Sequence, residues 1–173
     1  MTSTALPAYA ELHCLSNFTF LRGASHPEEL VKRAAELGYS ALALTDECSL
    51  AGAVRSHVAA KDLGLPLIIG SEIKLKDGPT LVLLATDREG YGNLADLITR
   101  GRRRSKKGGY SLGWEDFDSG LPECLALLVF PHPCPLPEGE GVKTVGAANR
   151  QMHVDVALAP GHGPSKLAAV DKY

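Results

Sequence analysis

Ala43-Leu44-Thr45-Asp46-Glu47 is a short apolar run that ends on polar side chains. The same pattern comes earlier, at Leu12-His13-Cys14-Leu15-Ser16, and later, at Ile68-Ile69-Gly70-Ser71-Glu72. A helix-like segment separates each stretch from the next. Successive β/α units place the carboxyl ends of their strands on one rim, where α/β folds hold metals and phosphates. The three stretches therefore predict an α/β fold with a polar rim.

Size and composition predict one soluble globular domain. The chain has 173 residues, of which 45% are hydrophobic and 22% charged, and its net charge is −2. This charge excludes a chain that is basic throughout, so any nucleic-acid contact needs a local patch. The longest apolar runs are far shorter than the roughly 20 residues of a membrane helix, which predicts no membrane contact. The four cysteines lack zinc-site spacing, and no secretion signal is expected, so the prediction is a cytoplasmic protein with reduced thiols.

Two helices are predicted between the three stretches. The first begins with a capping box of Ser25 and Glu28 and ends at Gly38. The second is capped by Ser49, has Val54 and Val58 facing inward, and ends at Gly64. Further strands are expected at 67–69, 80–85 and 124–130, with a helix carrying Leu94, Leu97 and Ile98 on one side. This alternation through about residue 130 predicts βαβ units.

Six cations lie within eight positions between the last two elements: Arg100, Arg102, Arg103, Arg104, Lys106 and Lys107. One interpretation is a solvated loop, which is the usual role of a charge run. The other is a contact with a phosphate backbone, where such side chains neutralise charge without reading sequence.

The composition changes at Pro131. Four prolines within 131–137 are followed by a segment rich in Gly, Ala, Pro and His, in which 154–158 is a candidate strand. We expect residues 1–9 to form an arm, 10–130 a partial domain, and 131–173 a poorly structured tail.

Four rim residues are candidate metal ligands: His13, Asp46, Glu47 and Glu72. Each also has an ordinary interpretation. A lone His is more often structural, and an acid after a strand often caps the next helix. A carboxylate at a buried strand end needs a cation, a metal or backbone donors. The repeated placement makes a metal site and these alternatives about equally favoured.

The three stretches resemble the N-terminal polymerase-and-histidinol-phosphatase (PHP) domain of bacterial C-family DNA polymerases. The similarity is greatest to the error-prone, second type of polymerase III alpha subunit, and it continues through Arg100–Tyr110 to about Val129. The resemblance implies a distorted (β/α)7 barrel, incomplete in this chain, with its site at the carboxyl rim. An incomplete barrel leaves an open sheet edge, so marginal stability is expected.

The family's metal motif is only partly present. His13 and Glu72 match it, but Leu15 replaces a second His, Glu47 replaces another, and Arg22 stands where many members have Asp. The resemblance thus implies a vestigial site in which Arg22 pairs with Glu47 or Glu72. We expect no resident cofactor, although a divalent metal at the altered site stays an alternative.

The resemblance implies a truncated segment of an error-prone DNA polymerase used in damage-tolerant replication and repair. The parent enzyme adds nucleotides with Mg²⁺ held elsewhere and acts with DNA and other replication or repair proteins. This chain lacks that polymerase active site, so alone it is expected to be structural and inactive. One alternative is a stand-alone metal-dependent PHP phosphoesterase, and another is a non-catalytic module that contacts DNA.

Overall fold

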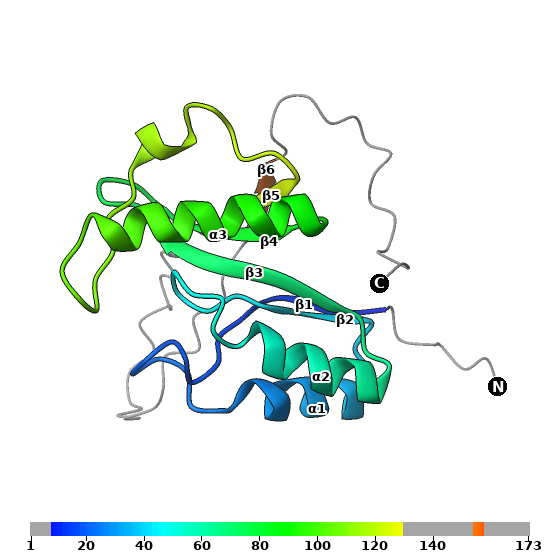
Figure 1. Cartoon of the computed structure of the whole chain (residues 1–173). Helices are drawn as coiled ribbons and strands as arrows, with labels where there is room; N and C mark the ends of the chain where they lie inside the picture. Colours follow the sequence, from blue (N-terminus) through cyan, green and yellow to red (C-terminus); the bar gives the residue numbers. More distant parts are fainter. Residues whose placement is uncertain (1–7, 130–153, 158–173) are drawn as a thin grey trace, which may run out of the picture.

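The computed structural model describes residues 8–129 and a strand at 154–157 (Figure 1). Its centre is a six-stranded sheet in the order β1 to β6. The first three strands are parallel and the last three are each antiparallel to the strand before. The strands are β1 (Ala10–Cys14), β2 (Ala41–Leu44), β3 (Leu67–Lys74), β4 (Thr80–Ala85), β5 (Cys124–Val129) and β6 (Val154–Ala157). The fold is mixed α/β, with the sheet curled into part of a barrel.

Three helices and one short 3-10 turn connect the strands. They are α1 (Pro27–Glu36), α2 (Ala53–Leu63), α3 (Arg88–Arg103) and η1 (Trp114–Phe117). In Figure 1, α1 and α2 lie side by side below the parallel strands, whereas α3 runs along β4. The loops at the left of that view, after β1 and after α3, lie near the rim.

Helix α1 begins one residue later than the predicted capping box. His26 is its N-cap, and the Glu29 carboxylate accepts a hydrogen bond from the His26 amide at 2.8 Å. Pro27 explains the shift, because a residue before proline is pushed to an extended backbone, and His26 has ψ 152°. The predicted pair of Ser25 and Glu28 is therefore wrong by one position.

Helix α2 differs more from its prediction. It begins after Gly52, not at Ser49, and ends as expected at Gly64. Its buried residues are Ala53, Ser56 and Ala60. Val54 is 73% exposed and Val58 is 55% exposed, so the prediction that they face inward is wrong. Ala60 packs in one cluster with Val31 and Ala34 of α1 and with Leu42 of β2, so the small side chains of α2 form its inner face and the larger valines lie on the outer face.

The parallel βαβ units end at β3, which corrects the predicted run of βαβ units: α3 still lies between β4 and β5, but these two strands are antiparallel. β3 pairs with β2 up to Ile69 and with antiparallel β4 from Gly70 onward. A Cβ atom on Gly70 would lie 2.6 Å from the Leu83 carbonyl oxygen, so the change of partner needs a glycine. Glu72 accordingly lies inside β3 and not at a strand end as expected.

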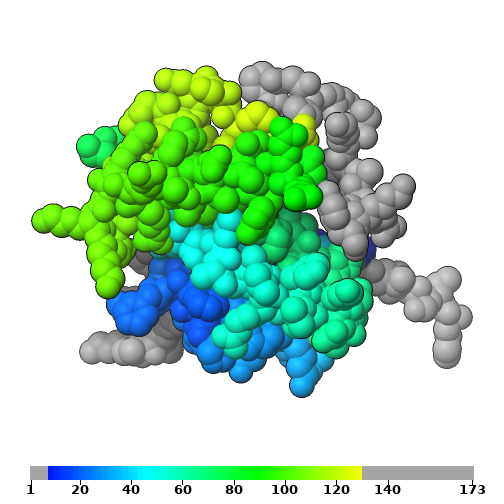
Figure 2. All heavy atoms as spheres, viewed as in Figure 1, coloured from blue at the N-terminus to red at the C-terminus, as the bar shows by residue number. Residues whose placement is uncertain are grey.

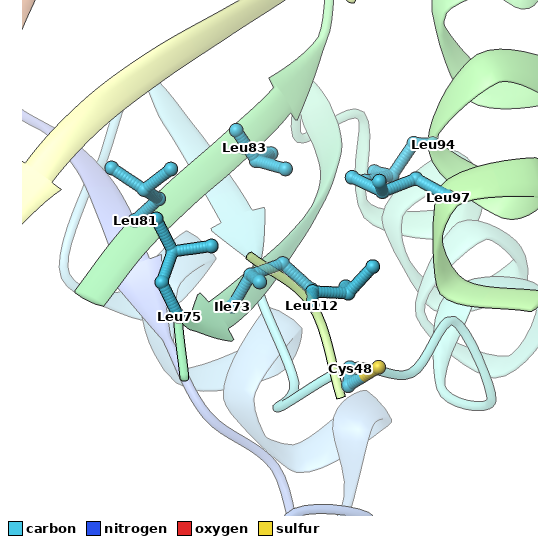
Figure 3. Packing of buried hydrophobic residues seen from close by; sticks show 8 residues of the cluster. All are labelled: Cys48, Ile73, Leu75, Leu81, Leu83, Leu94, Leu97 and Leu112. Carbon is cyan, nitrogen blue, oxygen red and sulfur yellow. The ribbon is translucent and has the colours of Figure 1, made fainter. Parts of the chain in front are cut away.

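The main core lies between α3 and the antiparallel part of the sheet. Figure 3 shows leucines from α3, β4 and the loop before η1 pointing toward one another. Its buried members are Cys48, Ile73, Leu75, Leu81, Leu83, Leu94, Leu97 and Leu112. Leu94 and Leu97 confirm the predicted inner face of α3. Burial raises the pKa of the Cys48 thiol to about 11, so this thiol is a packing group.

Most of the predicted arm and tail lies outside the described residues. Of 1–9 the structure describes only 8 and 9, and of 131–173 only β6, where a strand was a candidate. Among the described helices none has the length and apolar character that crossing a membrane requires.

Candidate functional site

Glu72 lies at the centre of the rim and is buried. Its Oε2 atom accepts a hydrogen bond from His13 Nε2 at 2.7 Å and one from Arg22 Nη2 at 3.1 Å. Arg22 Nη1 donates to the other carboxylate oxygen. Both oxygens of Glu72 are therefore occupied by donors of this chain.

These contacts keep Glu72 ionised. Burial pushes its pKa upward, but the hydrogen bonds and charges of His13 and Arg22 outweigh this effect and lower the pKa to about 2. The two carboxylates in turn raise the pKa of the Arg22 guanidinium, with the bond to Glu72 as the main cause.

Glu47 is the second carboxylate on Arg22. Its Oε2 atom accepts from Arg22 Nη1 at 2.9 Å, and its Oε1 atom accepts from the Tyr110 hydroxyl at 3.0 Å. A bridge between the backbones of Glu47 and Glu72 holds the two residues next to each other. Burial, followed by the nearby Glu47 charge, raises the pKa of the Tyr110 hydroxyl, so it stays protonated and donates.

Asp46 does not cap α2, whose N-cap is Gly52. Its buried carboxylate accepts hydrogen bonds from the Ser16 amide at 2.8 Å, the Ser16 hydroxyl at 2.7 Å and the Thr19 hydroxyl at 2.7 Å. Three donors satisfy a buried carboxylate without a metal. Asp46 therefore fixes the loop that follows β1.

The rim residues do not fit a divalent cation. A metal ligand needs a free lone pair aimed at the ion, and the Arg22 guanidinium already lies on Glu47 and Glu72 with a full positive charge. Among the four candidate ligands, only His13 has a buried side-chain atom without a hydrogen-bond partner in the described part of the chain, its Nδ1. Nowhere in the described part of the chain do three His, Cys, Asp or Glu side chains form a group that could hold a metal.

The structure divides the six cations of the basic run into two kinds. Arg102 lies in the last turn of α3 and donates to the carbonyl oxygens of Cys48 (3.0 Å), Glu47 (3.3 Å), Gly108 and Gly109 (both 3.4 Å). Its guanidinium also lies 5.4 Å from the centre of the Tyr110 ring. Arg102 thus connects α3 to the 46–48 segment and to the loop after α3 through hydrogen bonds.

Arg104 is exposed but is held by an ion pair. Its Nη1 atom reaches both oxygens of the buried Asp116, at 2.7 and 2.8 Å. By contrast, Arg100, Arg103, Lys106 and Lys107 are exposed and form no ion pair with any described residue. Only these four are available to a partner.

Sequence reasoning missed Tyr110, Arg102, Ser16 and Thr19 as parts of this site. The hydroxyls of Ser16 and Thr19 follow the first strand, which is a usable signal. Tyr110 is 63 positions from its partner Glu47 in the sequence, and Arg102 is 54 positions from Cys48. No local sequence pattern indicates contacts over such separations.

Residues 11–133 match the model of the PHP domain family. The chain is 63% identical over 130 residues to the error-prone DNA polymerase of Dechloromonas aromatica, which covers 72% of this chain and 13% of that protein. It is 53% identical over 165 residues to the error-prone DNA polymerase of Methylococcus capsulatus, with 94% of this chain and 16% of that protein covered. The chain thus spans less than a fifth of the length of these curated relatives.

Among solved structures, the chain is similar to an amidohydrolase from Chromobacterium violaceum with bound sulfate. The identity is 30% and the TM-score 0.48, covering 56% of this chain and 34% of the other.

Proposed function

This chain belongs to the PHP domain family, and we propose that it serves as the PHP segment of an error-prone DNA polymerase, with a structural and not a hydrolytic rim. The parent activity is template-directed DNA synthesis in damage-tolerant replication and repair, with Mg²⁺ bound in the polymerase part. The partners of the parent polymerase are DNA and other replication or repair proteins in the cytoplasm. The identities of 63% and 53% to two such polymerases support this assignment.

The observation that carries the structural role is the guanidinium of Arg22 between Glu47 and Glu72. Metal-assisted hydrolysis requires ions that lower the pKa of a bound water and polarise the substrate. Arg22 donates to both carboxylates and offsets one of their two charges, but it offers no coordination site and no activated water. The rim therefore stabilises the fold: it joins β1, the loop after β2 and β3 by charge-assisted hydrogen bonds.

Metal analysis of the purified chain tests the structural role. After exposure to Zn²⁺ or Mn²⁺ and desalting, we expect far less than one bound ion per chain, and no phosphatase or 3′-exonuclease activity that a chelator removes. His13→Ala should leave that background unchanged. Stoichiometric metal, together with hydrolysis that His13→Ala abolishes, would instead establish the alternative of a metal-dependent phosphoesterase.

A segment exchange tests the polymerase assignment. Residues 11–129 of this chain would replace the matching segment of the Dechloromonas aromatica polymerase, and primer extension would be measured. We expect the hybrid to extend primers at a rate close to that of its parent. A soluble, folded hybrid without synthesis would contradict the assignment.

A second role, as a DNA-contacting module, is favoured by the loop after α3. In this loop Lys106 and Lys107 are exposed and have no ion-pair partner among the described residues. Such cations bind phosphates by releasing counterions. This role predicts an affinity for DNA that falls steeply as salt is added.

A further inference from the structure

The loop after β1 exposes large apolar side chains beside the rim. Phe20 is 83% exposed and Leu21 is 88% exposed, and Phe18 is 40% exposed. Leu21 also has a φ of 65°, in the left-handed region that a residue with a Cβ atom rarely adopts. A strained, exposed apolar tip is unexpected in a loop whose only role is to connect two elements.

The rest of this loop is held firmly. The Thr19 amide donates to the Ser16 carbonyl at 2.9 Å, and the Arg22 amide donates to the Thr19 carbonyl at 3.1 Å. Asp46 binds the side chains of Ser16 and Thr19, while Arg22 is fixed by its two carboxylates. The anchored residues on both sides of Phe20 and Leu21 therefore present the apolar tip in one conformation.

The exposed cations after α3 belong to the same face of the molecule. Glu47 accepts hydrogen bonds from Arg22, next to Leu21, and from Tyr110 in the loop that carries Lys106 and Lys107. Arg102 fixes this second loop through the carbonyls of Gly108 and Gly109. In Figure 2 the blue segment after β1 and the yellow-green segment after α3 lie next to each other at the left of the molecule.

The charge of this face is positive. Arg22 offsets one of the two negative charges of Glu47 and Glu72. Arg102, Lys106 and Lys107 add three positive charges, and none of the three has an acidic partner among residues 8–129. Proteins that bind single strands without sequence preference combine such cations with exposed aromatic side chains, on which bases stack. A duplex keeps its base faces stacked inside and cannot use an aromatic tip in this way.

We propose that the Phe18–Leu21 tip and the loop carrying Lys106 and Lys107 form one binding platform for single-stranded DNA. A base stacks on Phe20, and the lysines contact the flanking phosphates. This inference rests on the proposed DNA-contacting role and specifies its substrate and its apolar residues. Leu21 supplies apolar contact. Arg22 is a positioning residue, because its ion pairs with Glu47 and Glu72 fix the chain next to Leu21.

Fluorescence anisotropy with a labelled oligothymidylate tests the platform on the full chain. We expect Phe20→Ala to weaken binding by about 5-fold or more, which is the usual effect of losing one stacked base. The matched control is Val54→Ala, which removes an equally exposed apolar side chain from α2 and should leave the affinity unchanged. Melting temperatures of both variants, measured by circular dichroism, verify that they fold.

The salt dependence tests the lysines separately. Between about 50 and 200 mM salt, changing Lys106 and Lys107 to Glu should reduce the log–log slope by about 0.7 for each phosphate that a lysine no longer neutralises. Lys32→Glu, an exposed cation on α1, should leave the slope unchanged.

The outcomes separate this inference from the roles proposed above. If only the lysine variants weaken binding, or a duplex of equal length binds as tightly as the single strand, the stacking platform is overturned and the DNA contact survives. If the chain does not bind the oligonucleotide at low salt, both are overturned, while the segment exchange still decides the polymerase assignment. If Phe20→Ala destabilises the hybrid polymerase but leaves oligonucleotide affinity unchanged, the tip contacts another part of the protein and the platform is wrong.

Discussion

The ionised state of Glu72 makes the stability of the protein depend on acid. Its folded-state pKa is lowered from 4.5 to about 2. As pH falls below about 5, Glu72 takes up a proton in the unfolded chain before it does so in the folded one. Its contribution to the free energy of unfolding is therefore fully present above about pH 5 and decreases as the pH falls to about 2. The loss should be about 2–3 kcal/mol, since Arg22 is half exposed and water screens part of its charge. Urea denaturation across this range measures it.

Glu72→Gln is the matched variant for the acid dependence. It should be less stable than the parent at pH 7, because Arg22 and His13 lose a charged acceptor. Between pH 5 and 2 its stability should fall by less than that of the parent. Equal slopes for both proteins would show that another carboxylate accounts for the acid dependence.

Leu21 makes a different prediction at the residue scale. Its φ of 65° is unfavourable for a side chain with a Cβ atom, and its side chain is 88% exposed and adds little packing. Leu21→Gly should therefore stabilise the fold by about 0.5–1 kcal/mol, measured by urea denaturation. Leu37→Gly, also exposed but with a φ of −80°, should destabilise it. If Leu21→Gly and Leu37→Gly both stabilised the fold, the positive φ of Leu21 would not explain the effect.

The candidate site was only partly predictable from sequence at this scale. His13, Glu47 and Glu72 were expected at the site, and Arg22 was expected to pair with Glu47 or Glu72. The structure brings these residues together and pairs Arg22 with both carboxylates. The role of Asp46 was not foreseen, since its partners depend on how the loop after β1 folds back. The contacts of Tyr110 and Arg102 depend on the packing of α3, which local sequence patterns do not encode.

At the scale of elements, two glycines in α3 form a matched pair. A Cβ atom on Gly90 would lie 1.9 Å from the carbonyl oxygen of Glu123, whereas one on Gly92 would meet nothing within 4 Å. Gly90→Ala should destabilise the fold by about 1–3 kcal/mol, because α3 must move away from the segment before β5. Gly92→Ala should stabilise it by about 0.5–1 kcal/mol through helix propensity. Thermal unfolding of both variants measures this, and similar shifts would contradict the close approach.

The two kinds of arginine at the end of α3 give another element-scale prediction. Arg104→Ala leaves the buried Asp116 carboxylate with the Gly113 amide as its remaining donor, and should cost about 1–3 kcal/mol. Arg103→Ala removes an exposed side chain and should change stability by less than about 0.5 kcal/mol. Guanidinium denaturation separates the two, and equal effects would show that the ion pair does not hold η1 to α3.

Element types were predicted better than element faces. The strands at 41–44 and 80–85 and the inner face of α3 follow from runs of apolar residues, and the structure confirms them. The strand expected at 124–130 is confirmed for 124–129, and its last residue lies outside the described residues. The inner face of α2 was wrong because β-branched residues, Val54 and Val58, were preferred over Ala and Ser for the interior. The antiparallel direction of β4 was missed, because a strand pattern alone does not give strand direction and the short turn at 75–79 brings the chain straight back along β3.

At the scale of the whole molecule, the described sheet has an open side. β1 pairs with β2 and with no other described strand, so no described strand pairs with the backbone groups of its outer edge. Val54 and Val58 add exposed apolar surface on α2. An open edge together with apolar surface favours association with another chain. The chain alone should therefore self-associate, as the incomplete barrel predicts.

Replacing the two valines tests the apolar part of this surface. Changing Val54 and Val58 to Ser should leave the melting temperature almost unchanged, since both are exposed and Ser and Val have similar helix propensities. The weight-average mass in sedimentation equilibrium should fall, because less apolar area is available for association. Val31→Ser is the control: Val31 is fully buried, and its loss should lower the melting temperature strongly. If the double variant unfolds as readily as Val31→Ser, then α2 packs against part of the chain beyond the described residues, and its outer face is not a free surface.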